Sequence, residues 1–324
     1  MEVRSSDFSG LVEAGALEKE VDGSDTPVFV PFELGATKQK APRVSMAPAQ
    51  SQVICIASGK GGTGKTTFTT NLAISLQSKG LRVLIVDADF GLANDHLLLG
   101  LNPDGDVGDV LSGRKDVREV LLEGPEGIHL LPGGVGSSDL SALEDYDLRN
   151  LAREIGRLEP DYDVILVDLA AGISPQIMRF LRPSHEIILV TNPEVTALVD
   201  AYGLIKSLSV WNEQKAVELK VVLNRVKSRE DSVASMQRLR QVVNKHLPSI
   251  KLNYMGYIPF DRYLLHSISI QKPVILSHPR SQVVACIKAI SQRLHANFKA
   301  WERKQEVKTP VPSYFAKLEQ QSYE

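Results

Sequence analysis

The stretch GKGGTGKT, residues 59–66, restricts the fold of this chain more than any other feature. It follows the apolar run VICIAS and precedes TTFTTNLAISLQSKG, which has the composition and spacing of a helix. A glycine-rich turn between a buried strand and a helix, ending in lysine and a hydroxyl residue, lets backbone N–H groups converge on phosphate oxygens. The sequence therefore predicts a phosphate-binding loop at a strand-to-helix turn.

Further apolar runs alternate with helical stretches after this loop. The runs are RVLIVDAD, DVILVDL, EIILVTN, KVVLNRV and MGYIP, and the last long helix is expected over residues 281–301. Runs that are apolar throughout, rather than at every second position, are typical of strands covered on both faces. We expect an α/β fold with a doubly wound, mostly parallel β-sheet flanked by helices.

Composition changes along the chain predict three parts. Residues 1–50 lack sustained periodicity and end in a Pro/Ala/Ser/Gln-rich stretch, so we expect a flexible N-terminal extension or linker. Residues 51–301 form the α/β domain, and residues 302–324 form a C-terminal tail with a possible short amphipathic helix.

Charge, hydropathy and cysteine content favour a cytoplasmic protein. The net charge is −2, and there is no apolar run long enough for a signal peptide or a membrane span. Cys55 and Cys286 lie far apart in the sequence, which suits a reducing compartment and argues against an iron–sulfur carrier.

The loop residues have distinct expected roles. Lys65 neutralises the β- and γ-phosphates of a nucleotide, and Thr66 ligates Mg²⁺. The nucleotide-binding residues predicted here are Gly59, Lys60, Gly61, Gly62, Thr63, Gly64, Lys65, Thr66 and Thr67.

Carboxylates at strand ends are expected to complete a magnesium site. Asp87 and Asp89 end one apolar run, two residues apart, and Asp168 ends another in the position of a Walker B aspartate. We therefore assign Thr66, Asp87 and Asp168 to the metal, and we interpret Asp95 as a solvated turn residue.

These motifs together resemble the deviant Walker A ATPases of the MinD/ParA family, from about residue 53 to residue 295. The stretches GLANDHLLLGL, LLPGG and TALVDAYGLIK are most similar to the FlhG (FleN) branch, which regulates flagellar number and placement. The resemblance implies slow ATP hydrolysis by a homodimer that closes around ATP and Mg²⁺. It also implies three catalytic residues. Lys60 acts across the dimer interface, Lys65 acts within its own subunit, and Asp89 orients the attacking water.

By the same resemblance Asn224 and Pro259 embrace the adenine. Leu169 departs from the family, which usually has a small polar residue after the Walker B aspartate. The implied partners are an FlhF-like GTPase or other polar components, although residues 1–50 contain no convincing match to the segment that activates FlhF.

The sequence offers one candidate surface for membrane contact and one basic stretch, and it allows several alternative functions. Tyr314, Phe315 and Leu318 suggest a C-terminal helix, capped by Ser313, for peripheral membrane contact. The segment from Lys220 to Lys245 contains seven basic residues, and we interpret it as a solvent-exposed helix. DNA binding is therefore not expected. The alternatives to an FlhG-like function are a MinD-type septum-site ATPase, a ParA-like partitioning protein and a non-hydrolysing, ATP-gated scaffold.

Overall fold

The computed structural model describes residues 50–90, 92–134, 144–213, 215–305 and 313–321. The extension expected over residues 1–50 falls almost entirely outside these ranges, so its flexibility stays a prediction. All described residues belong to one compact unit, Ala49–Glu324.

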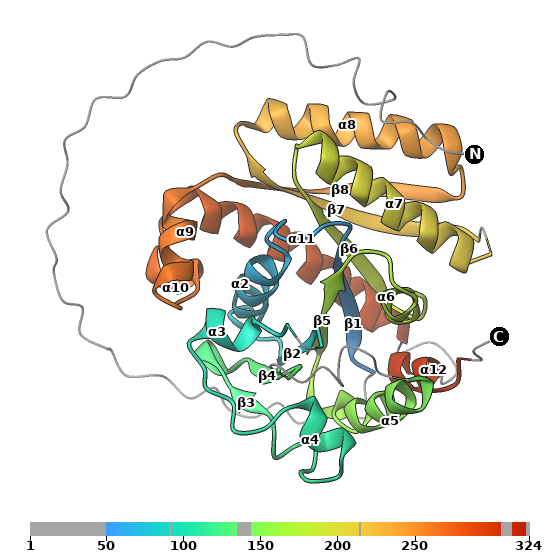
Figure 1. The fold of residues 1–324 in the computed structure, drawn as a ribbon. Helices are drawn as coiled ribbons and strands as arrows, with labels where there is room; N and C mark the ends of the chain where they lie inside the picture. Colours follow the sequence, from blue (N-terminus) through green and yellow to red (C-terminus); the bar gives the residue numbers. More distant parts are fainter. Residues whose placement is uncertain (1–49, 91, 135–143, 214, 306–312, 322–324) are drawn as a thin grey trace, which may run out of the picture. The chain divides into compact units, whose positions relative to one another are not determined.

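A sheet of eight strands forms the centre of this unit (Figure 1). The strands lie in the order β3-β4-β2-β5-β1-β6-β7-β8, and all neighbours are parallel except β3 and β4. Their bounds are β1 Gln52–Ser58, β2 Val83–Ala88, β3 Leu122–Glu123, β4 His129–Leu131, β5 Val164–Ala171, β6 Glu186–Thr191, β7 Val217–Val226 and β8 Ile250–Pro259. This arrangement confirms the predicted fold class.

Helices connect the strands and cover the sheet (Figure 1). α2 packs against β2 and α11, and α11 also packs against β8, whereas α7 lies between α6 and α8. Each residue of β1 and β2 is buried as a result, which explains why most residues of these strands are apolar. The helices are α2 Lys65–Gln77, α3 Asp95–Leu99, α4 Val107–Leu111, α5 Asp145–Gly156, α6 Pro175–Leu181, α7 Val195–Trp211, α8 Arg229–His246, α9 Arg262–Ser269, α10 Val274–Ser277, α11 Gln282–Gln305 and α12 Tyr314–Glu319, with short 3-10 turns at Pro125–Gly127 and Glu159–Asp161.

The strand order places the predicted motifs side by side. β5 lies between β1 and β2, and Asp87 of β2 is the register partner of Asp168 of β5. Because neighbouring parallel strands keep their side chains in step, both carboxylates leave the same face of the sheet. The phosphate-binding loop leaves the end of β1 beside them.

The predicted tail helix is present as α12, but its apolar face is covered. Ser313 Oγ accepts a hydrogen bond from the backbone N–H of Ala316, as expected of an N-cap. Tyr314, Phe315 and Leu318 are each at most 1% exposed, and α12 packs against α5. The apolar surface considered for membrane contact is therefore turned into the protein.

Polar contacts fix α12 in the same place. The Tyr314 hydroxyl donates to the carbonyl oxygen of Phe180, in α6, at 2.8 Å. Arg153 of α5 pairs with Glu319 at 2.8 Å. The helix is thus bonded to both α5 and α6.

Replacing Phe315 by alanine is expected to lower the free energy of unfolding by about 3 kcal/mol or more, because it removes a buried aromatic ring and leaves a cavity. Glu319→Ala is the control, since it removes only an exposed ion pair and should cost less than about 1 kcal/mol. Urea denaturation of the full chain measures both. Equal stability of the Phe315→Ala and unaltered proteins would show that α12 does not pack as described.

No helix in the described part of the chain is both long and apolar enough to cross a membrane.

Candidate functional site

The predicted phosphate loop lies between the end of β1 and the start of α2. Gly64 immediately precedes α2 with φ 86°, in the left-handed region, and a Cβ there would lie 2.2 Å from Asn224 Nδ2. Both the backbone angle and the close contact require glycine at this position. By contrast, a Cβ on Gly61 or Gly62 would meet nothing within 4 Å, so this side of the loop is open to a ligand.

Asp168 accepts hydrogen bonds from three side chains beneath the loop. Its Oδ2 accepts from Lys65 Nζ at 2.9 Å and from Thr66 Oγ1 at 2.8 Å, and its Oδ1 accepts from Thr69 Oγ1 at 2.8 Å. Asp168 is fully buried, so these three donors compensate its charge. The structure thus brings the predicted Walker B aspartate directly to the first turn of α2.

The contact with Asp168 keeps Lys65 charged. Burial by itself would lower the pKa of Lys65, but the attraction of the Asp168 carboxylate outweighs it, and the pKa lies above its usual value. A permanently charged ammonium at this position is suited to phosphate oxygens.

A cavity of about 490 Å³ opens over the loop. It brings together most of the predicted nucleotide-binding residues with Asp89, whereas Gly59, Lys60, Asp87, Asp168, Asn224 and Pro259 are not among its lining residues. The lining residues are Ser58, Gly61, Gly62, Thr63, Gly64, Lys65, Thr66, Thr67, Asp89, Asn94, Leu97, Leu98, Ala171, Arg225, Ile268 and Gln271.

Asp87 and Asp89 take different positions although they are two residues apart. Asp89 lies just beyond the end of β2 and lines the cavity, and burial raises the pKa of its carboxyl. Asp87 is 1% exposed and accepts backbone N–H groups of Asp89, Asn94 and Asp95 at 3.0–3.2 Å. Asp87 therefore organises the loop after β2, a role that the sequence does not reveal.

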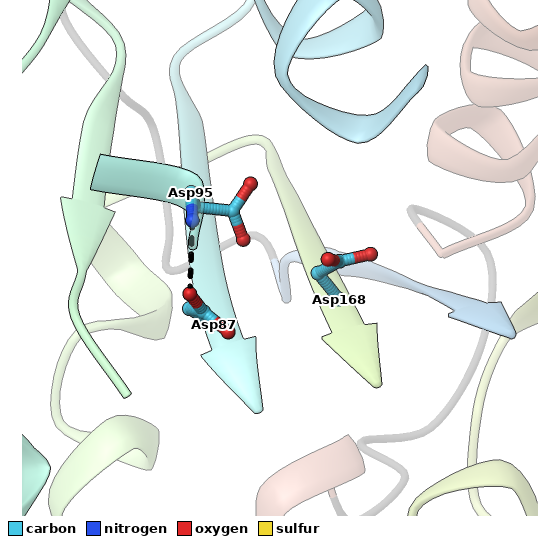
Figure 2. A group of neighbouring side chains, drawn as sticks. All are labelled: Asp87, Asp95 and Asp168. Carbon is cyan, nitrogen blue, oxygen red and sulfur yellow. Dashed lines mark hydrogen bonds between the residues drawn. The ribbon is translucent and has the colours of Figure 1, made fainter. Parts of the chain in front are cut away.

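Asp95 is not a solvated turn residue, and the prediction for it is wrong. It is the first residue of α3, it is 0% exposed, and its carboxyl lies with those of Asp87 and Asp168 (Figure 2). Ligand oxygens of the three residues lie within 4.8 Å of one another. Backbone N–H groups of the loop after β2 donate hydrogen bonds to the Asp87 carboxylate. The loop therefore folds back toward the sheet, and Asp95 becomes buried.

The crowding of carboxylates shifts their pKa values upward. Burial, reinforced by the Asp168 charge, raises the pKa of Asp87 to about 7. The same two causes raise the pKa of Asp95 well above its usual range.

Lys60 does not line the cavity above the loop. Its ammonium lies 3.3 Å from Thr196 Oγ1 and 3.9 Å from Glu194 Oε2, at the start of α7, and its side chain is 44% exposed. Lys60 and Lys65 therefore occupy different environments although they belong to one loop.

The two residues predicted to contact adenine are both buried. Asn224 is 2% exposed, its Nδ2 donates to the carbonyl oxygen of Thr63 at 2.7 Å, and its Oδ1 accepts from the N–H of Arg225. Asn224 thus braces the loop, and its contact with adenine stays a prediction. Pro259 is buried at the end of β8, so its adenine contact also stays a prediction.

Sequence reasoning missed the outer wall of the cavity. Leu97, Ile268 and Gln271 come from α3, α9 and the turn after α9, where the sequence motifs assigned no ligand-binding role to any residue. Arg225 could have been found, since it directly follows Asn224; its φ of 54° is unusual for a residue other than glycine.

Leu169, which follows the Walker B aspartate, is 1% exposed and pairs in register with Ala88 of β2. An apolar side chain here is buried in the fold and does not enter the cavity.

The residues present fit a nucleotide and Mg²⁺. Open space above Gly61 and Gly62, a charged Lys65 and the hydroxyl of Thr66 form a cradle for phosphate groups. Thr66 and the carboxylates beside it supply only oxygen atoms, the donor type that Mg²⁺ prefers.

Comparison with known proteins places this site in a family. Residues 54–274 match the model of the CobQ/CobB/MinD/ParA nucleotide-binding domain. The chain belongs to this family. It is therefore a P-loop ATPase of the MinD/ParA group, which confirms the resemblance found in the sequence.

Two named bacterial proteins are similar to this chain. The antiactivator FleN of Pseudomonas aeruginosa is 36% identical over 250 residues, covering 77% of this chain and 88% of FleN. The flagellum site-determining protein YlxH of Helicobacter pylori is 34% identical and covers 64% of this chain and 69% of YlxH.

A solved structure shares the fold of this MinD/ParA domain. The septum site-determining protein MinD of Pyrococcus horikoshii, complexed with Mg-ADP, matches with a TM-score of 0.61 and 28% identity. The match covers 75% of this chain and 96% of MinD. It supports nucleotide and Mg²⁺ binding at the corresponding site here.

Proposed function

We propose that the protein is an ATP-gated dimeric switch that hydrolyses ATP slowly and regulates the number or placement of flagella. The observation that supports hydrolysis most directly is the position of Asp89, whose carboxyl lines the same cavity as Lys65 and Thr66. Similarity to FleN and YlxH supports the flagellar process.

Lys65 and Thr66 contact the phosphates and metal in this proposal. The Lys65 ammonium, bonded to Asp168 in the structure, lies within the loop and binds the β- and γ-phosphates of ATP. The Thr66 hydroxyl and Asp168 hold Mg²⁺, with Asp87 supporting the loop beside them. Bound Mg²⁺ neutralises charge on the phosphate oxygens.

Asp89 orients the attacking water. It lines the cavity, and burial raises the pKa of its carboxyl. A carboxylate with a raised pKa is a stronger general base than an exposed aspartate. One carboxylate remains a weak base, so turnover is slow, and a slow reaction suits a timed switch between two conformations.

The dimer is proposed because Lys60 does not reach the cavity of its own subunit. In an ATP-bound dimer its ammonium contacts the phosphates of the second subunit, and Asn224 with Pro259 contacts the adenine. Partner proteins, such as an FlhF-like GTPase, distinguish the dimer from the monomer.

A cytoplasmic location is part of this proposal, since ATP is available there and both cysteines are free. Peripheral membrane contact through α12 requires that the helix first leave α5 and α6, because its apolar residues are buried as folded. DNA contact is not proposed: Lys220, within the basic stretch, is buried in an ion pair with Glu186.

A chromosomal Lys65→Ala substitution tests the biological role. We expect cells of the source organism to carry an abnormal number of flagella, counted by electron microscopy, because the switch cannot bind ATP. Lys288→Ala, on the exposed side of α11, is the control and should leave the number unchanged. Normal flagella together with misplaced septa would instead support the MinD-type alternative.

A further inference from the structure

Three carboxylates meet beneath the phosphate loop without lining its cavity. Asp87 comes from β2, Asp95 from the start of α3 and Asp168 from β5, and each is at most 1% exposed (Figure 2). An oxygen of each lies within 4.8 Å of the other two. Among the described residues, the cation that contacts the group is Lys65, through Asp168 alone. When all three carboxyls are ionised, three closely spaced negative charges face one positive charge.

Asp95 is the member whose charge the described residues leave uncompensated. Asp87 accepts three backbone N–H groups, and Asp168 accepts three side-chain donors. Both carboxyl oxygens of Asp95 are buried and have no hydrogen-bond partner in the described part of the chain. Its side chain extends toward Asp168 (Figure 2). A buried carboxylate in this situation is strongly unfavourable unless a cation or another partner joins it.

The geometry suits a small, hard cation. Opposite ligands of an octahedral Mg²⁺ are about 4.2 Å apart, and those of Ca²⁺ about 5 Å apart, so oxygens within 4.8 Å of one another can surround one ion after small movements. Carboxylate oxygens favour Mg²⁺, Mn²⁺ and Ca²⁺ over softer metals.

We propose that Asp87, Asp95 and Asp168 bind a divalent cation in the absence of nucleotide. This site shares Asp168 with the magnesium site at Thr66, but it needs neither ATP phosphates nor the cavity above the loop. A cation here links β2, β5 and α3, and so fixes the loop between Asp87 and Asp95 before nucleotide binds. The proposal does not depend on ATP hydrolysis or on the flagellar role.

Titration of Mn²⁺ into the metal-stripped full chain tests the site, with no nucleotide present. The electron paramagnetic resonance signal of free Mn²⁺ falls as the ion binds, and we expect one bound ion per chain. Asp95→Asn should weaken binding at least tenfold, because the substitution removes the charge but keeps the side-chain shape and the backbone N–H that bonds to Asp87.

Glu159→Gln is the matched control. Glu159 is also buried, at 6% exposed, but it lies away from the three aspartates, where it accepts from the N–H of Phe315. Its Mn²⁺ affinity should equal that of the unaltered protein. Mn²⁺ should also raise the melting temperature of the unaltered and Glu159→Gln proteins but not that of Asp95→Asn.

Two results would overturn the proposal. One is that the unaltered protein binds no Mn²⁺ without nucleotide, which would mean that protons alone neutralise the cluster. The other is equal Mn²⁺ affinity in the unaltered and Asp95→Asn proteins. If Asp95→Asn does not fold, Asp95→Ser replaces it in both the Mn²⁺ titration and the melting experiment.

Discussion

Replacing Asp89 by alanine is expected to lower ATP turnover by about 100-fold or more, because a positioned carboxylate that orients water contributes a factor of this order. ATP affinity should stay close to that of the unaltered protein, since Lys65 and the loop N–H groups, which contact the phosphates, are unchanged. Phosphate release under saturating ATP measures turnover, and a fluorescent ATP analogue measures affinity. The combination of lost turnover and retained affinity is specific to a role in the chemical step.

Asp104→Ala is the control for Asp89→Ala. Asp104 is an exposed aspartate whose nearest charged partner is Lys115, at 3.4 Å, and it lies outside the cavity. Equal turnover in the Asp89→Ala and unaltered proteins would show that another group orients the water. No turnover in any of the three proteins, with ATP still bound, would favour the non-hydrolysing scaffold.

The fold and the centre of the site could be predicted because their signals are local. The loop motif contains its own ligand-binding groups, and the apolar runs mark strands that are buried on both faces. Asp168 directly follows the apolar residues of such a run, so its position in the second half of β5 needs no tertiary information. The short strands β3 and β4 escaped prediction because two or three residues give no periodic pattern.

Asp95 and α12 show why the remainder could not be predicted. Asp95 stands in a polar loop sequence, and only the three hydrogen bonds to Asp87 turn that loop inward. The apolar face of α12 was recognised correctly, but its partner lies far away in the sequence, in α5 and α6. A sequence pattern shows that a surface must be covered, and it does not show what covers it.

Lys60→Ala is expected to abolish the ATP-dependent dimer while leaving ATP binding by each subunit nearly intact. The Lys60 ammonium contacts Thr196 and lies outside its own cavity, so its removal takes no phosphate ligand from its own subunit. Lys65→Ala should also abolish the dimer, but for a different reason, because it removes the buried ammonium that binds the phosphates. Light scattering with and without ATP measures the dimer, and the fluorescent ATP analogue measures binding.

ATP affinity, and not dimer formation, distinguishes the Lys60→Ala and Lys65→Ala variants. Both lose the dimer, yet only Lys65→Ala loses ATP, and Lys288→Ala on the exposed side of α11 should behave as the unaltered protein in both assays. Because Lys65→Ala leaves buried Asp168 with only its two hydroxyl donors, circular dichroism must first show that this variant is folded. A Lys60→Ala protein that dimerises normally with ATP would show that Lys60 does not act across the interface. A Lys60→Ala protein that loses ATP affinity as Lys65→Ala does would place both lysines in the cavity of a single subunit.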